Sequence, residues 1–317
     1  MRRKPFPFLL LALVALAAPA LAETRAGLVM RPMPAGKIAE LKFEIDQYLE
    51  SDTDAGFDHD MRVFAARGRV RLFPERERRS PLLGWDVLHI DTDTADPRIP
   101  EQLTGAAVAL GFGLPAGDWI LNVTVGAGFA GDEPFDGRGW YGLASVTATR
   151  RFDERDTLTL GLDFDGNRPV FPDVPLPVAV WIRKWGDTLR TSIGFPFLGI
   201  TWEPTTWFTF TFRGIPGLFQ TGSATFHVHD DIDIFVRYRG ANFRFFLDGS
   251  PGGRRLFYSE QRVELGVTAT FQDVEVTLVV GWALDREFST GWDLRDDDVF
   301  ATLDETVLFG LTITIRF

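Results

Sequence analysis

The sequence predicts an all-β fold: a transmembrane, antiparallel, up-and-down β-barrel of about 14 strands, within a range of roughly 12 to 16, because single-chain barrels of this class carry even strand numbers. Apolar and polar residues alternate with a period of two along many short segments, as they do on the two faces of a strand. Hydrophobic residues make up 45% of the chain, yet no run after residue 22 approaches the roughly 18 apolar residues that a membrane helix needs. Short turns also alternate with long polar loops, which is typical of membrane barrels.

The N-terminus has the pattern of a secretory signal peptide, residues 1–22. Arg2, Arg3 and Lys4 precede an apolar run at residues 6–17, and Pro19 to Ala22 offers a small-residue cleavage site. The apolar run is short for a membrane helix, so an uncleaved anchor is the weaker alternative. We expect residues 23–36 to form an N-terminal periplasmic segment and residues 37–317 to form the barrel.

Charge and cysteine content exclude several classes of function. Loss of the three leader cations takes the formal net charge from -11 to -14, and such a chain repels nucleic acid. The absence of cysteine excludes disulfides, lipid attachment at cysteine and thiolate metal sites. No cofactor is expected.

The predicted strands follow one another from residue 37 onward. Residues 37–49 alternate Leu41, Phe43 and Ile45 with Lys42, Glu44 and Asp46, which favours a strand over a helix. The same alternation recurs at residues 119–127, 157–165, 208–213, 263–271 and 274–282.

The connections between these strands are of two kinds. Short turns are predicted at residues 115–118, 153–156, 186–187, 203–206, 230–231 and 272–273. Long connections are predicted at residues 50–60, 92–102, 131–138, 166–177, 214–222, 248–255 and 285–304, and we expect these loops to face outside. Residues 194–197 leave the strand count open, because Gly-Phe-Pro-Phe either reverses the chain between two short strands or forms a bulge in one long strand.

The last strand carries the most specific signal. Its apolar face is Phe309, Leu311, Ile313, Ile315 and Phe317. A chain that ends on such a strand with an aromatic residue resembles the closing strand of bacterial outer-membrane barrels, in which these positions are read by the barrel-assembly machinery. The resemblance implies a location in the cell outer membrane of a diderm bacterium, with outer-membrane lipid and that machinery as partners.

Aromatic residues at strand ends agree with a membrane location. Tryptophans lie beside the predicted turns or at strand ends, where their rings would meet the lipid headgroups; they are Trp119, Trp140, Trp185, Trp202, Trp207 and Trp282. A secreted β-sandwich or a lipocalin-like barrel is the soluble alternative.

A narrower resemblance, which covers residues 40–317, is carried by motifs within residues 165–207. The proline-rich stretch at residues 167–177, Gly194-Phe195-Pro196 and Trp202-Glu203-Pro204 resemble, in this order, a family of outer-membrane barrels of unknown function found mainly in planctomycete-type bacteria. The resemblance implies a barrel and brings no catalytic residues.

Charged residues of both signs fall on the predicted inward faces. The acidic ones are Asp163, Asp165, Glu264 and Glu275, and the basic ones are Arg183, Arg213, Arg237 and Arg239. Such a lumen can select polar solutes, or its charges can pair and plug the barrel. We therefore expect a passive pore or transporter for small solutes rather than an enzyme, with a non-conducting structural or adhesion barrel as the alternative. The solute and the oligomeric state are left open.

Three other patterns are weaker. His227 and His229 share one strand face near Ser223, which allows a metal site or an outer-membrane lipid hydrolase, but two lumen-facing polar side chains explain them more simply. Residues 126–131 spell G-x-G-x-x-G without the helix that a dinucleotide site needs. The acidic loops at Asp52 to Asp60 and Asp293 to Asp298 lack the order of an EF-hand and are expected to be solvated.

Overall fold

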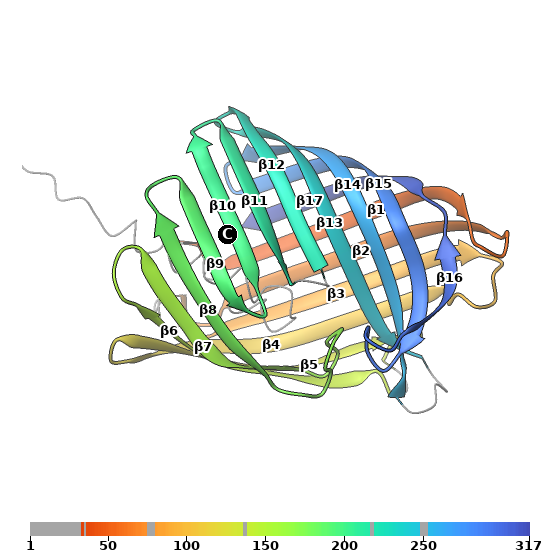
Figure 1. Ribbon diagram of the computed structural model, residues 1–317, viewed down its shortest axis with the longest axis horizontal. Helices are drawn as coiled ribbons and strands as arrows, with labels where there is room; N and C mark the ends of the chain where they lie inside the picture. The colour runs from red at the N-terminus through yellow and green to blue at the C-terminus, as the bar shows by residue number, and fades with distance from the viewer. Residues whose placement is uncertain (1–32, 35, 75–79, 136–137, 216–218, 248–252) are drawn as a thin grey trace, which may run out of the picture.

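A computed structural model describes residues 33–34, 36–74, 80–135, 138–215, 219–247 and 253–317 as a barrel of β-strands (Figure 1). The predicted signal peptide and most of the predicted periplasmic segment lie outside the described residues. Within these ranges no helix is long and apolar enough to cross a membrane. The strands are β1 (Ala39–Asp52), β2 (Asp58–Arg71), β3 (Leu82–Thr94), β4 (Gln102–Ala116), β5 (Trp119–Gly131), β6 (Trp140–Arg151), β7 (Asp156–Asp165), β8 (Leu176–Trp185), β9 (Leu189–Phe195), β10 (Leu198–Thr205), β11 (Phe208–Ile215), β12 (Phe219–His229), β13 (Ile232–Phe246), β14 (Arg255–Phe271), β15 (Val274–Gly291), β16 (Asp298–Leu303) and β17 (Thr306–Arg316).

The sheet closes through the antiparallel pairing of its first and last strands. β1 pairs with β17 from Glu40 opposite Arg316 to Tyr48 opposite Leu308. β15 pairs with β17 over one part of its length and with β16 over the rest, so β16 and β17 together form one wall strand. The closed barrel therefore has sixteen strands. The predicted count of about 14 is wrong, although sixteen lies at the upper edge of the predicted range.

The Gly-Phe-Pro-Phe segment reverses the chain and does not form a bulge. β9 and β10 pair as antiparallel neighbours, with Ile193 opposite Leu198. Pro196 and Phe197 lie in the turn between them, after a cis Phe195–Pro196 peptide bond. Proline has no N–H to donate to a ladder, so the turn is the place where it costs no pairing.

The two ends of the barrel differ as the sequence predicts, except that the long connection predicted at residues 214–222 is wrong, because β11 runs to Ile215 and β12 begins at Phe219. All six predicted short turns lie at one end of the barrel, where β1 begins and β17 ends. We name this the turn end. The long connections after β1, β3, β5, β7, β13 and β15 lie at the opposite end, which we name the loop end. This arrangement agrees with the layout of membrane barrels.

The outside of the barrel is apolar over the turn-end part of its strands. Outward side chains with at least 38% of their surface exposed include Phe43 and Ile45 of β1, Val263, Leu265 and Val267 of β14, and Phe309 of β17. Exposed tryptophans at positions 181, 185, 202, 207 and 282 lie on the same surface. A continuous apolar surface of this extent is unusual in water and is expected in lipid.

The wall of the barrel is not of uniform height. β9, β10 and β11 have 7 or 8 residues, whereas β13, β14 and β15 have 15 to 18. Beyond the short strands, β13 meets β5 through a single parallel bridge between Phe246 and Gly131. A Cβ atom at position 131 would lie 3.3 Å from the Phe246 carbonyl oxygen, so glycine allows this close approach. The contact narrows the barrel at its loop end.

A pair of adjacent substitutions tests the membrane face. Leu278 points outward from β15 and is 59% exposed, whereas Thr277 points inward and hydrogen-bonds Thr268. We expect Leu278→Lys to lower the free energy of unfolding in lipid vesicles by about 2–4 kcal/mol, because a charge on the lipid face is costly. Thr277→Lys should cost much less. Urea unfolding followed by tryptophan fluorescence measures both, and equal losses would contradict the assigned faces.

Candidate functional site in the barrel lumen

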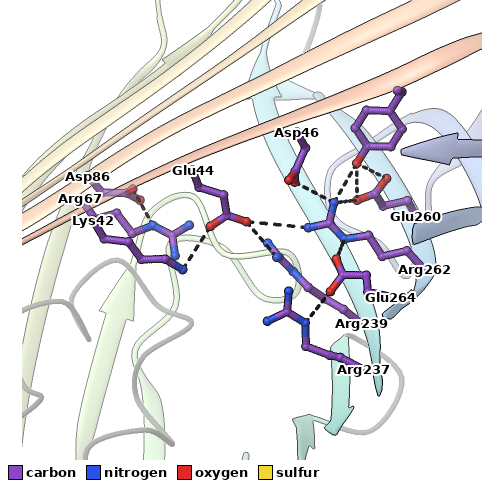
Figure 2. Close-up of polar contacts among 11 residues, drawn as sticks. Lys42, Glu44, Asp46, Arg67, Asp86, Arg237, Arg239, Glu260, Arg262 and Glu264 are labelled. Carbon is purple, nitrogen blue, oxygen red and sulfur yellow. Dashed lines mark hydrogen bonds and ion pairs between the residues drawn. The ribbon is translucent and has the colours of Figure 1, made fainter. Parts of the chain in front are cut away.

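The centre of the lumen holds ten charged side chains from five strands, which we name the lumen charge network (Figure 2). Its members are Lys42, Glu44 and Asp46 of β1, Arg67 of β2, Asp86 of β3, Arg237 and Arg239 of β13, and Glu260, Arg262 and Glu264 of β14. Five are carboxylates and five are cations. Their formal charges therefore cancel at neutral pH.

Arg262 is the most buried cation of the network, with 2% of its residue surface exposed. Its Nη1 atom donates to Asp46 Oδ2 at 2.8 Å and lies 3.6 Å from Glu260 Oε1. Its Nε atom lies 2.8 Å from Glu264 Oε1, a close ion contact whose angle is too poor for a hydrogen bond. One guanidinium thus neutralises carboxylates from both β1 and β14.

Glu44 is the corresponding acidic centre. Its Oε1 atom accepts from Arg239 Nη1 at 2.9 Å and lies 3.8 Å from Arg262 Nη2, while its Oε2 atom lies 3.2 Å from Lys42 Nζ. Beside it, Arg67 Nε donates to Asp86 Oδ1 at 3.0 Å. Buried charges persist only when they are paired in this way.

Two inward-facing glycines let the side chains of β1 and β14 meet. β17 and β15 lie between those strands, and their inward positions beside the network include Gly310 and Gly281. A Cβ atom on Gly310 would lie 2.5 Å from Asp46 Oδ1, and one on Gly281 would lie 3.2 Å from Glu264 Cγ. The missing side chains therefore leave room for the carboxylates.

Aromatic residues seal the lumen on the loop-end side of the network. Glu260 accepts hydrogen bonds from Tyr48 at 2.7 Å and from Tyr258 at 3.0 Å. The ring of Tyr258 packs in a tilted arrangement against that of Phe288, with 5.0 Å between the ring centroids. Beyond these rings lies a continuous apolar core that includes Met61, Ile90, Leu103, Phe245, Leu256 and Leu308, all fully buried. The loop end is filled by the side chains of the barrel itself.

The connection between β7 and β8 closes the remaining part of the loop end. Arg168 bonds both the backbone oxygen and the carboxylate of Asp163 on β7. On the far wall, Pro169 O accepts from Leu294 N at 2.9 Å, Asp293 accepts from Phe171 N at 3.1 Å, and Arg255 donates to Gly166 O at 2.9 Å. We name residues 166–175 and 292–297 the loop cap. It ties β7 to β13–β15 across the mouth.

Arginines anchor the acidic loops. Arg98 and Arg295 each bond a carboxylate two residues earlier, Asp96 and Asp293. Hydrogen bonds from Arg98 hold the pKa of Asp96 below its ordinary value. Burial alone would raise the pKa of Asp293, but hydrogen bonds from Arg295 and from the Phe171 N–H lower it. Because Asp293 is fully buried, the expectation that this loop is simply solvated is wrong for that residue.

The predicted lumen residues fall in several places. Arg237, Arg239 and Glu264 meet in the lumen charge network, whereas Asp163 and Asp165 lie under the loop cap. Glu275 pairs with Arg316 at the turn end, at 3.3 Å. Arg213 lies on the same inward face of β11 as Thr209 and Thr211. The role of all these residues in selectivity stays a prediction.

Arg183 does not face the lumen, and that expectation is wrong. Its guanidinium lies over the rings of Trp185 and Trp181, at 4.6 Å and 5.8 Å from their centroids. Both rings are exposed on the outer face of β8. The long arginine side chain extends along the apolar outer surface to the turn end, where its Nη1 atom lies 3.9 Å from Asp156 Oδ1.

His227 lies in the lumen near the turn end, between a hydroxyl and a carboxylate. Its Nε2 atom is 2.9 Å from Thr209 Oγ1 and its Nδ1 atom is 2.7 Å from Asp233 Oδ1. His229 lies at the following turn, where its Nδ1 atom accepts from Asp231 N. Among the described residues no three metal-ligating side chains come together. The expectation that both histidines are polar lining residues stays a prediction.

The terminal apolar residues lie on the outer face of the closing strand. Phe309 is half exposed there, and Leu311, Ile313 and Ile315 follow on the same face of β17. Phe317 N donates to Ala39 O at 2.9 Å, which pins the chain end to β1. Their reading by the assembly machinery stays a prediction.

Most members of the lumen charge network escaped sequence analysis. The sequence predicts Lys42, Glu44 and Asp46 on the polar face of a strand but predicts no site from them, nor from Arg67, Asp86, Glu260 and Arg262. A signal exists in the alternation at 260, 262 and 264, where three charges share one strand face. Their partners on β1 could not be found from spacing.

Comparisons with known proteins give distant structural likenesses. The sequence matches no protein-family model and no curated protein sequence, so the narrower resemblance at residues 165–207 stays a prediction. Among solved structures the chain is similar to the TodX deltaS2S3 mutant monoaromatic hydrocarbon channel, at 11% identity, a TM-score of 0.44 and 94% coverage of each chain. A bacterial polysaccharide outer membrane secretin gives 8% identity and a TM-score of 0.44, with 89% of this chain and 99% of that chain covered. OprB of Pseudomonas putida gives 10% identity and a TM-score of 0.33, with 89% and 94% covered.

The burial of Arg262 predicts an asymmetric response to substitution. Arg262→Met leaves Asp46, Glu260 and Glu264 without their shared cation, and we expect it to lower the free energy of unfolding by about 3–5 kcal/mol. Arg237→Met removes one partly exposed contact to Glu264, which keeps Arg262, and should cost about 1 kcal/mol. Urea unfolding in detergent micelles measures the difference. Similar losses for the two variants would contradict the central role of Arg262.

The close approach of Asp46 to Gly310 predicts that a larger residue at position 310 destabilises the barrel. Gly310→Ala places a methyl group against Asp46 and Val279, and we expect a loss of about 1–3 kcal/mol from overpacking. Gly199→Ala is the matched control, because its Cβ would meet Ser192 at an ordinary 3.5 Å. The same unfolding assay compares them, and a neutral Gly310→Ala would show that the carboxylates do not need this space.

Proposed function

We propose that this chain is a bacterial outer-membrane β-barrel that acts as a channel for small solutes and is closed at its loop end in the resting state. The apolar outer belt, the exposed tryptophans and the closed sheet support a location in lipid. The seam at the chain terminus and the division into turn end and loop end support the outer membrane.

The observation that carries the proposal is the change in water access along the lumen. At the turn end the inward side chains of Glu40, Arg316 and Glu275 expose 23%, 29% and 31% of their surface. Deeper in, Arg262 and Glu264 expose 2% and 1%. A barrel of sixteen strands is too wide for one layer of side chains to fill. We name the water-accessible part, from Glu40 to the lumen charge network, the turn-end vestibule.

The loop cap is the element that passage would displace. The aromatic core is carried by paired strands, so its side chains cannot leave without breaking the wall. The connection after β7 is held instead by side-chain contacts such as Arg168 with Asp163 and Phe171 with Asp293. Segments held by a few polar contacts open more readily than core strands do.

A non-conducting structural barrel is the second candidate. The equal numbers of cations and carboxylates in the lumen charge network favour it, because paired charges and a filled loop end also serve a barrel that never opens. The two functions make opposite predictions for conductance.

Single-channel recording in a planar bilayer tests the proposal. The variant Asp163→Asn with Asp293→Asn removes two carboxylates that hold the loop cap, one on β7 and one within the cap. The control variant, Asp54→Asn with Asp96→Asn, removes two carboxylates that bind Arg98 outside the loop cap. We expect the first variant to raise the open probability about tenfold over the natural chain, since roughly 1.4 kcal/mol shifts an equilibrium by that factor. The second variant should behave as the natural chain does.

A silent barrel counts against the channel only if it is folded. Folding of each variant is checked by heat-modifiable migration on gels. If the folded loop-cap variant and the folded natural chain both stay silent at all voltages, the channel proposal fails and the structural barrel replaces it.

A further inference from the structure

The two signs of charge in the lumen charge network differ in their access to water. The side chains of Arg67, Lys42, Arg237 and Arg239 expose 41%, 38%, 30% and 26% of their surface. Their partners Glu44, Asp86 and Glu264 expose 9%, 11% and 1%. The network is neutral as a whole, but its carboxylates and Arg262 lie behind its other four cations. The floor of the turn-end vestibule is therefore cationic.

Within the part of the chain that the structure describes, two of these cations make no hydrogen bond or ion pair through Nη1 or Nη2. Arg67 and Arg237 each bind their carboxylate through Nε, to Asp86 and Glu264 respectively. Figure 2 shows no contact from the terminal nitrogens of either guanidinium to the other residues drawn. The Nη1 and Nη2 edge of a guanidinium matches two oxygens of a carboxylate or phosphate.

The cations also lie close to one another. Glu44 is the common partner of Lys42 and Arg239, and Lys42 lies directly opposite Arg67 in the pairing of β1 with β2. Like charges held together on one surface repel, and a bound anion would offset that repulsion. The low-dielectric walls of a barrel strengthen the attraction of such a surface for an anion.

We propose that Lys42, Arg67, Arg237 and Arg239 form a binding site for a small oxyanion, the phosphate or carboxylate group of a solute that enters from the turn end. The site names the solute class for the proposed channel, and its physiological role rests on that function. Binding itself requires only the folded barrel. The acidic chain as a whole, with a formal net charge of -11, repels anions, so any binding must come from this local surface.

Isothermal titration calorimetry of the folded chain in detergent micelles at low salt measures the affinity of the site. Inorganic phosphate and acetate are titrated separately, which distinguishes the two oxyanion groups. We expect one of them to bind saturably and the variant Arg67→Gln with Arg237→Gln to weaken that binding about tenfold or more, because roughly 1.4 kcal/mol of lost interaction is a factor of ten. Arg316→Gln is the control, because Arg316 pairs with Glu40 and Glu275 at the turn end, and it should bind as the natural chain does.

A charge-retaining variant and the conductance measurement distinguish failure of the oxyanion site from failure of the proposed channel. Arg67→Lys with Arg237→Lys retains both charges but loses the two-nitrogen edge. Its affinity for the oxyanion should lie between those of the natural chain and the glutamine variant. No saturable binding by the folded natural chain, or an equal loss in Arg316→Gln, would overturn the site. Binding without conductance would support the site and reject the channel, whereas conductance without binding would support the channel and reject the site.

Discussion

Closure of the sheet through the β1–β17 seam is the constraint on which the rest of the molecule depends. In lipid every backbone N–H and C=O must be paired within the protein, and a closed barrel achieves this because it has no edge. Closure also gives each strand one face toward lipid and one toward the lumen. Charges from strands as distant in sequence as β1 and β14 are thereby directed into one interior, where burial forces them to pair.

The lumen is filled in a different way at each level. At the loop end the short strands β9 to β11 stop, β5 meets β13, and aromatic rings complete an apolar core. In the middle, long side chains cross the lumen above Gly281 and Gly310. At the turn end the inward side chains of Glu40, Glu275 and Arg316 pair with one another and still reach water. Because the turn-end residues and four cations of the lumen charge network reach water while the core on the loop-end side is buried, the barrel has a vestibule at one end and a seal at the other.

Sequence reasoning succeeded where neighbours two residues away decide the outcome. The strand at residues 39–52, the six short turns, the division of loops between the two ends and the outward face of β17 follow from local alternation. It failed where a distant partner decides. The Pro196 segment has two acceptable local structures, and only pairing of β9 with β10 selects the reversal. Arg183 lies on the outward face of β8 with Trp181 and Trp185, so the two exposed tryptophans, and not the charge of the arginine, indicate which face is outward.

By itself the sequence determined the all-β class, the membrane-facing surface and the polarity of the lumen, because a period of two is a property of the chain that any pleated strand expresses. Only the tertiary structure decided which charges meet. Arg262 and Asp46 are 216 residues apart and touch at 2.8 Å because strand number, curvature and two glycines bring their side chains across the lumen. No local pattern encodes that distance, so the lumen charge network and the cationic floor of the vestibule emerge only from the closed barrel.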